Sequence, residues 1–235
     1  MSQELAQPIN TAVGAPIQHH KGFEEGVDAE DLIIPRIKLL QKTAKEMDMQ
    51  ELAVKPGMLI NNITKDIFQQ PLEFVPIFKK TYYIRFNPQK DKDYGFDPAF
   101  APGALIYIKS TKEECGQDAE WIDNNPPLAK RTISFMVALP KYPGVPFILT
   151  FSKTSLKTGQ ELVSMLKFAG CDMFARKFTL SSQSAEKNGN TYYTLKVVPA
   201  GKVDNVAEYE AMHASMSARV TVEHVAETDA PEFTE

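Results

Sequence analysis

Short apolar runs of strand length, each bounded by glycine, proline or polar residues, constrain this chain more than any other feature. Residues 72–78 and 82–86 alternate with a period of two, which is the pattern of a strand with one buried face. Residues 104–108, 131–139 and 146–152 are three further runs of this kind. A chain with so many short strands favours a mostly β structure.

The connections between these runs are also informative. Pro35 argues against a regular helix through residues 32–40, so we expect an extended segment there, and residues 57–60 predict another short strand. Residues 87–103 and 109–130 are rich in Asp, Lys, Pro and Gly and are predicted to be long loops. Long loops inside a β domain frequently carry function.

Helical signals occur only in the second half of the chain. Ser155 is a candidate N-cap and Gly170 a candidate stop for a helix whose apolar positions are Leu162, Val163, Leu166 and Ala169. Residues 174–183 and 191–199 predict two strands joined by an Asn-Gly turn, a strong hairpin signal. A second helix is expected over residues 204–217.

This order of elements predicts an α+β fold that is mostly β. We expect an OB-fold-like small β-barrel with long loops, an inserted helix and a C-terminal helix. The expected organisation is a flexible acidic arm over residues 1–31, an OB-like nucleic-acid-binding domain over 32–219 and a disordered acidic tail over 220–235. A generic α+β sandwich would give the same order of elements.

Charge is distributed unevenly along the chain, whose formal net charge is -4. Residues 1–31 hold one basic and six acidic residues, and residues 220–235 hold no basic and five acidic residues. Residues 32–219 keep 25 basic and 19 acidic residues, a net charge of +6. A basic body between acidic ends suits a polyanionic ligand.

Signals of catalysis, metal binding and membrane insertion are missing from the sequence. Walker-type, GxSxG, CxxC and HExxH motifs do not occur, and no carboxylate cluster has metal-site spacing. No run approaches the roughly 20 apolar residues that span a bilayer, and residues 1–18 lack a secretory pattern. Cys115 and Cys171 are expected to be reduced and buried thiols. We therefore expect a soluble cytoplasmic protein that is not an enzyme, without catalytic residues, metal or cofactor.

Aromatic and basic residues interleave most densely over residues 78–86. Because alternate residues of a strand share a face, we expect one set to pack inward and the other to point outward. The inward set is Tyr82, Ile84 and Phe86, and the outward set is Tyr83 and Arg85, with Lys79 and Lys80 at the entrance. A base can stack on an exposed ring while Lys or Arg holds the adjacent phosphate. The alternative is that both tyrosines pack in the core or across strands.

A second basic region covers residues 153–202, which hold eight basic and three acidic residues. Trp121, in a polar loop before the Lys130-Arg131 pair, is a further candidate for base stacking. The candidate nucleic-acid contacts are Lys79, Lys80, Tyr83, Arg85, Trp121, Lys130, Arg131, Lys153, Lys157, Lys177, Tyr193 and Lys196. The alternatives are a solvated helix face with an ordinary hairpin, and a tryptophan that anchors its loop.

Two resemblances bear on function. Residues 22–24 and 31–41, followed by 56–58 and 72–76, resemble a family of small tailed-phage proteins, some of which are assigned to single-stranded DNA binding. The acidic C-terminus, with Asp229, Glu232 and Phe233, resembles the tails of bacterial and phage single-stranded DNA-binding proteins. That likeness implies a tail that recruits replication proteins and competes with DNA, although here Thr234 and Glu235 follow the aromatic residue.

Two hypotheses follow. The first is a sequence-nonspecific single-stranded DNA-binding protein of phage replication or recombination, with single-stranded DNA as its ligand, replication proteins as partners of the tail, and no contact with membranes. The second is a phage protein-interaction module that binds or inhibits a host protein, in which the basic body meets an acidic host surface and the aromatic residues form a protein interface. A nuclease or hydrolase is weakly supported. The oligomeric state stays open, and a homo-oligomer is one option.

Overall fold

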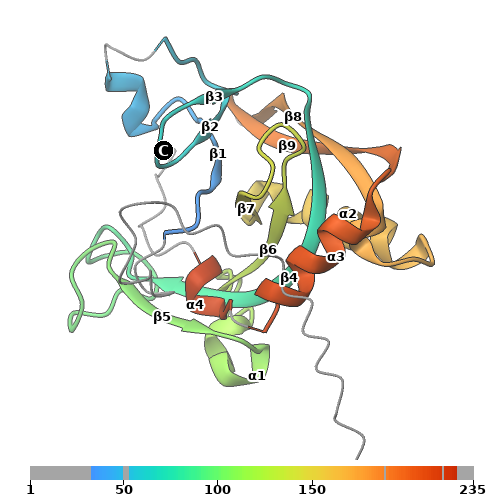
Figure 1. Cartoon of the computed structure of the whole chain (residues 1–235). Helices are drawn as coiled ribbons and strands as arrows, with labels where there is room; N and C mark the ends of the chain where they lie inside the picture. Colours follow the sequence, from blue (N-terminus) through green and yellow to red (C-terminus); the bar gives the residue numbers. More distant parts are fainter. Residues whose placement is uncertain (1–32, 50–52, 188, 219, 227–235) are drawn as a thin grey trace, which may run out of the picture. The chain divides into compact units, whose positions relative to one another are not determined.

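A single long strand, β4 (Leu72–Phe86), organises the larger of two sheets. β6 (Lys130–Ala138) pairs with most of β4, and β7 (Pro146–Phe151) extends the sheet beyond β6. On the other side of β4, β8 (Arg176–Lys187) pairs with its start and β5 (Leu105–Lys109) with its end. All of these pairings are antiparallel, as Figure 1 shows for this computed structural model.

The structure describes residues 33–49, 53–187, 189–218 and 220–226. β9 (Asn190–Lys202) completes the larger sheet beside β8, and a smaller sheet has the order β1 (Ile37–Leu39), β2 (Leu59–Asn61), β3 (Ile67–Phe68). The α-helices are α1 (Lys112–Cys115), α2 (Leu156–Phe168), α3 (Val206–Met216) and α4 (Val222–Val225). Short 3₁₀ helices are η2 (Lys45–Asp48), η3 (Gly116–Ala119), η4 (Lys153–Ser155) and η5 (Met173–Ala175).

A β-bulge between Pro76 and Phe78 changes which residues of β4 face each of two separate cores. Before the bulge, Leu72 and Phe74 belong to the first core cluster, which lies under α2 and also takes residues from both sheets. After it, even-numbered residues such as Tyr82 belong to the second core cluster, under η5, α3 and α4. A bulge adds one residue to a strand and so exchanges the faces that alternate residues occupy.

The first core cluster is rich in aromatic rings. Its fully buried phenylalanines are Phe74, Phe135, Phe147 and Phe151. Each such ring contributes about 1.5–3 kcal/mol by leaving water. α2 approaches β7 closely at Gly159, where a Cβ atom would lie only 2.6 Å from Cβ of Phe151. Glycine at this position therefore lets the helix cover the core.

Side chains cover the outer edge of β9. Gln41 donates from Nε2 to the Tyr193 carbonyl (2.8 Å) and accepts at Oε1 from the Tyr193 amide (3.0 Å). Two residues further on, the Thr158 hydroxyl donates to the Leu195 carbonyl at 3.0 Å. An edge strand with satisfied backbone groups is a poor template for pairing with another chain.

Arg36 joins the start of the described chain to its end. Its guanidinium donates to the carbonyl oxygens of His224 (3.4 Å), Val225 (2.8 Å) and Ala226 (2.5 Å) at the end of α4. Val225 and Ala226 are buried in the second core cluster. Residues 220–226, which the charge pattern groups with the acidic tail, are thus part of the packed structure.

The α+β fold class is confirmed, and strands and helices form at the expected runs. Ser155 precedes α2 without a side-chain capping bond, because its hydroxyl accepts from the Leu195 amide instead. Cys115 is buried as expected, but Cys171 is exposed.

The structure merges the runs at 72–78 and 82–86 into β4, and it shows that the expected loop at 109–130 is wrong in part, because α1 and η3 lie within it. A capping box between Thr111 and Glu114 starts α1. Among the described residues the two sheets share a hydrophobic core, but the one β-bridge between them is the isolated bridge between Arg36 and Ile148. The OB-type barrel is not confirmed.

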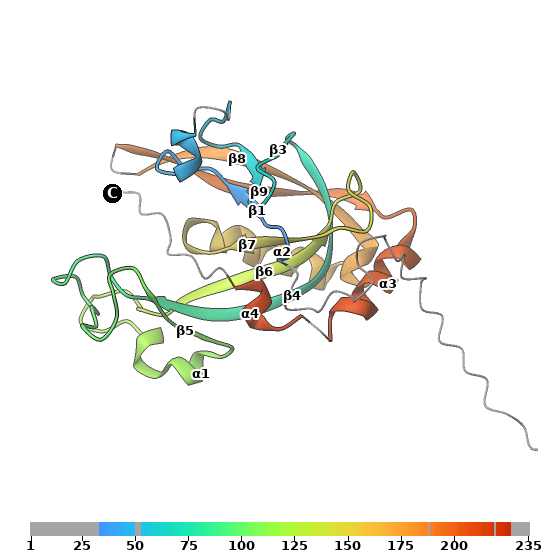
Figure 2. The ribbon, with the colours of Figure 1, turned by 60° about the vertical axis from the view of Figure 1, so that its left-hand side comes forward.

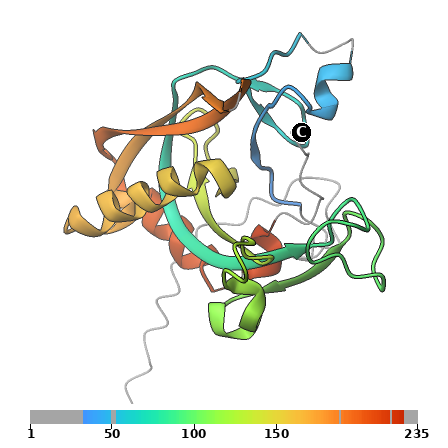
Figure 3. The same ribbon diagram turned by 180° about the vertical axis from the view of Figure 1, so that it is seen from behind.

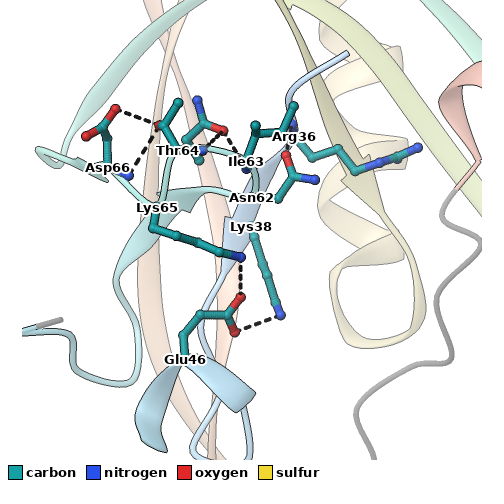
Figure 4. A network of polar contacts seen from close by, with 9 residues as sticks. Arg36, Lys38, Glu46, Asn62, Ile63, Thr64, Lys65 and Asp66 are labelled. Carbon is teal, nitrogen blue, oxygen red and sulfur yellow. Dashed lines mark hydrogen bonds and ion pairs between the residues drawn. The ribbon is translucent and has the colours of Figure 1, made fainter. Parts of the chain in front are cut away.

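A buried carboxylate holds the smaller sheet to η2, as Figure 4 shows. Glu46 is 4% exposed, and its two carboxylate oxygens accept from Nζ of Lys38 (2.9 Å) and of Lys65 (3.1 Å). Burial alone would raise the pKa of Glu46, but hydrogen bonds from the lysines and its own backbone lower it to about 2. The ionised carboxylate therefore stabilises the fold.

This network predicts an acid-sensitive contribution to stability. Because the folded pKa lies below the unfolded value, the contribution is complete above about pH 4.5 and is lost as the pH falls towards 2. This contribution to the free energy of unfolding is on the order of 3 kcal/mol.

Urea unfolding at pH 7 and pH 3 tests the network. The free energy of unfolding should fall less between these two pH values in Glu46→Gln than in the parent. Asp48→Asn, an exposed change in the same 3₁₀ helix, is the control; an equal loss in all three proteins would contradict the assignment.

Candidate nucleic-acid interface

The C-terminal half of β4, which carries the interleaved basic and aromatic residues, is covered by the segment that contains α1 and η3. Tyr82 and Ile84 are buried, and Phe86 packs against the same second core cluster, as the alternation predicts. Tyr83 shares the opposite face with Arg85, but it is half-buried and packs against Cys115, Ala119 and Ala129. The expectation that this face points outward is wrong, because the segment containing α1 and η3 folds over it.

Arg85 is part of a polar cluster that pins two loops together. Its guanidinium donates to Oδ2 of Asp118 (2.7 Å) and to the Gly95 carbonyl (3.1 Å), and its side chain is 16% exposed. The Tyr107 hydroxyl donates to the same Asp118 oxygen at 2.7 Å. Burial and this bond raise the pKa of Tyr107. Arg85 is therefore committed to internal partners rather than presented to a phosphate.

The loop before β5 has its own buried centre. The side-chain amide of Asn87, which is fully buried, donates to the carbonyl oxygens of Asp97, Phe100 and Ala101. It accepts from the Asp97 amide at 2.8 Å. Buried side-chain bonds of this kind hold a loop in one conformation. The loop is therefore preformed, and it displays exposed aromatic residues such as Phe100.

The remaining predicted residues divide into packed and accessible groups. Nζ of Lys177 lies 3.8 Å from Oε1 of Glu73. The ring of Tyr193 packs on Gly57, since a Cβ atom added to Gly57 would lie 2.6 Å from the ring. Lys80 is half-buried, with its Nζ 5.9 Å from the Phe78 ring. The exposed residues are Lys79, Trp121, Lys130, Arg131, Lys153, Lys157 and Lys196. Asp229, Glu232 and Phe233 of the tail, and the arm over residues 1–31, lie outside the described residues.

An open groove of about 590 Å³ runs between α2 and β9. Its lining combines polar and apolar side chains, namely Lys157, Gln160, Glu161, Ser164, Met165 and Val197. Thr158 fixes the start of α2 to β9, so the two walls of the groove are held together. Lys153 precedes α2 in η4, and Lys196 precedes Val197 in β9, where successive side chains point to opposite faces of the strand.

Two further aromatic residues of α2 and β9 were not among the predicted contacts. Phe168, the last residue of α2, is 84% exposed. Tyr192 is half-buried in β9, where it pairs with Ala185 of β8. Phe168 does not lie on the apolar face that Leu162 and Leu166 form, so helical periodicity could have identified it as an exposed aromatic residue.

Positive and negative charges separate along β4. Residues 87–129 hold four basic and eight acidic residues, whereas residues 130–202 hold eleven basic and three acidic residues. The first segment covers the end of β4 that pairs with β5, and the β8–β9 hairpin starts from the opposite end. Figures 2 and 3 show α1 and the hairpin far apart. The strongest positive field therefore lies over the part that contains α2 and β9.

The described residues include no group of His, Cys, Asp or Glu side chains that could hold a metal ion. Within the same residues, no helix combines the length and apolar character needed to cross a membrane. What the fold and surface define is an α+β protein with a basic face.

A family model described as Pam3 phage gp34-like protein matches residues 9–224. The chain therefore belongs to the Pam3 phage gp34-like protein family, which confirms the expected phage origin. No curated protein matches the chain, and no solved structure matches it.

The cluster around Arg85 predicts a structural effect. Asp118→Asn removes the charge that balances a largely buried guanidinium and should lower the free energy of unfolding by about 1–3 kcal/mol. Glu120→Gln is the matched control, because Glu120 pairs with Lys112 at the surface and such pairs are worth about 0–1 kcal/mol. Thermal and urea unfolding measure both variants. Equal stabilities of the two variants would show that the cluster does not hold the loops.

Proposed function

We propose that this phage protein binds single-stranded DNA without sequence preference, through the basic surface of η4, α2 and β9. The observation that carries the proposal is the set of exposed lysines on η4, α2 and β9, namely Lys153, Lys157 and Lys196, of which Lys157 lines the groove. They belong to a segment of eleven basic and three acidic residues. Phosphates neutralised by such lysines release counterions, which drives binding at low salt.

The apolar part of the groove supports single-stranded rather than duplex DNA. Met165 and Val197 offer apolar surface in the groove that Lys157 lines, and Phe168 offers an exposed ring at the end of α2. Unpaired bases can use such surfaces because every base has an apolar face, whereas the bases of a duplex are stacked on one another. Stacking of this kind tolerates any sequence.

The proposal reassigns several of the predicted contacts. Lys130 and Arg131 are exposed where β6 begins, but they pair with the end of β4 that also pairs with β5, so they lie outside the proposed surface. Arg85 and Tyr193 become packing residues, because their partners are internal. The second candidate function, a protein-interaction module, is favoured by one observation: Trp121 is 70% exposed in the acidic segment.

The test replaces three lysines of the proposed surface together, as Lys153→Gln, Lys157→Gln and Lys196→Gln. Fluorescence anisotropy with a labelled dT oligomer should show affinity at least about tenfold weaker at low salt. The log–log salt slope should fall by about 2, which is roughly 0.7 for each lost phosphate contact. A duplex of equal length should bind the parent more weakly than dT does.

The matched control removes three other exposed lysines, as Lys42→Gln, Lys90→Gln and Lys92→Gln. Both triple variants lose the same charge, so only the position of the lysines differs between them. The control should keep nearly the affinity of the parent. Absence of dT binding by the parent at low salt, or equal losses in both triple variants, would contradict the proposal.

A further inference from the structure

The chain's sole tryptophan, Trp121, is exposed on a rigid turn. Its side chain is 70% exposed. The next residue, Ile122, exchanges two backbone hydrogen bonds with Asn125 (3.2 and 2.8 Å). Asp123 and Asn124 between them have positive φ angles of 48° and 64°, a conformation that Asn and Asp tolerate better than other non-glycine residues. The ring is therefore presented by a preformed turn.

A second loop supports this turn from the side. Gly95 lies against Leu128, since a Cβ atom on Gly95 would come within 2.2 Å of the Leu128 side chain. Arg85 bonds both the Gly95 carbonyl and Asp118, three residues before the tryptophan. Tyr94, next to Gly95, is also exposed. Two loops that are pinned together thus display aromatic rings to solvent, and we call residues 87–129 the loop face.

Preformed aromatic surfaces are typical of protein interfaces. Tryptophan and tyrosine are enriched at the residues that contribute most to protein–protein binding. A rigid surface also loses little conformational entropy when a partner binds. The exposed rings of the loop face therefore suit a protein partner.

The charge of the loop face indicates the charge of the partner that it suits. The loop face holds four basic and eight acidic residues, a net charge of -4. Glu120 precedes the tryptophan, Asp123 lies two residues after it, and both are exposed. Such a surface repels a phosphate backbone and attracts Lys or Arg, which can also lie over an aromatic ring.

We propose that the loop face binds a basic, Arg- or Lys-rich segment of a partner protein, with Trp121 as the central anchor. This surface is separate from the proposed DNA-binding groove, which lies between α2 and β9. The protein would then connect two ligands of opposite charge: a nucleic acid on its basic surface and a basic protein segment on its loop face.

The sole tryptophan makes the full-length protein its own probe. A short peptide of alternating Arg and Ser should change the Trp121 emission in a saturable manner, and the same peptide with Glu in place of Arg should not. A dT oligomer should leave the emission unchanged while its own anisotropy reports binding. The two proposals therefore fail separately: dT anisotropy tests the DNA site, and tryptophan emission tests the loop face.

Variants locate the peptide site. The double change Glu120→Gln and Asp123→Asn should raise the Kd for the Arg-Ser peptide about tenfold. Glu161→Gln with Glu186→Gln removes the same charge outside the loop face and should leave the Kd unchanged. Peptide anisotropy with Trp121→Ala should show a similar tenfold loss, with Phe168→Ala as the exposed-ring control. Circular dichroism verifies that each variant is folded.

Four results would overturn the proposal. Quenching of Trp121 by dT would mean that the ring stacks on bases. No change of emission on adding the Arg-Ser peptide would mean that no basic segment binds there. Equal peptide affinity for the parent and Trp121→Ala would remove the anchor. An emission shift that depends on protein concentration alone would assign the loop face to a second copy of the chain.

Discussion

The guanidinium of Arg36 is the contact through which distant parts of this fold depend on one another. It holds three carbonyl oxygens at the end of α4, while its own backbone pairs with Asn62 after β2. The preceding carbonyl, of Pro35, accepts from Ile148 in β7. A buried chain of hydroxyls, Thr150 to Ser134 to Tyr82, continues from β7 across β6 to β4. The arginine side chain thereby holds α4, and the backbone of Pro35 and Arg36 links the smaller sheet to the larger one.

Local patterns predicted the elements of this fold well, because alternating burial and helical spacing are properties of neighbouring residues. The β-bulge after Pro76 is different. It depends on how β4 and β6 align, and it moves Tyr83 and Arg85 onto the face that begins with Leu72 and Phe74. The packing of Val225 could not be predicted from the sequence either, because its hydrogen-bond partner Arg36 is 189 residues away in the chain. The segment around Pro35 and Arg36, which resembles phage proteins in sequence, has a structural role, because it holds α4 and contacts β7.

The candidate site was predicted in part for the same reason. Exposed lysines such as Lys157 and Lys196 were found because charge composition alone marks a basic region. Arg85 was misplaced, because the sequence does not show that Asp118, 33 residues later, folds back to meet it. Trp121 was found as an aromatic residue in a polar loop, but only the paired loops reveal an acidic surface around it. The separation of charge along β4 thus explains why one chain can offer two chemically different surfaces.

Hydrogen exchange of the full-length protein, with and without a saturating dT oligomer, tests this division of surfaces most directly. Binding at the basic surface should slow exchange of backbone amides in η4, in the first turns of α2 and in β9, because a bound strand shields them and suppresses local opening. Exchange over residues 87–129 should stay the same within error. Protection centred on residues 87–129, with α2 and β9 unaffected, would contradict the account and place the nucleic acid on the surface that carries Trp121.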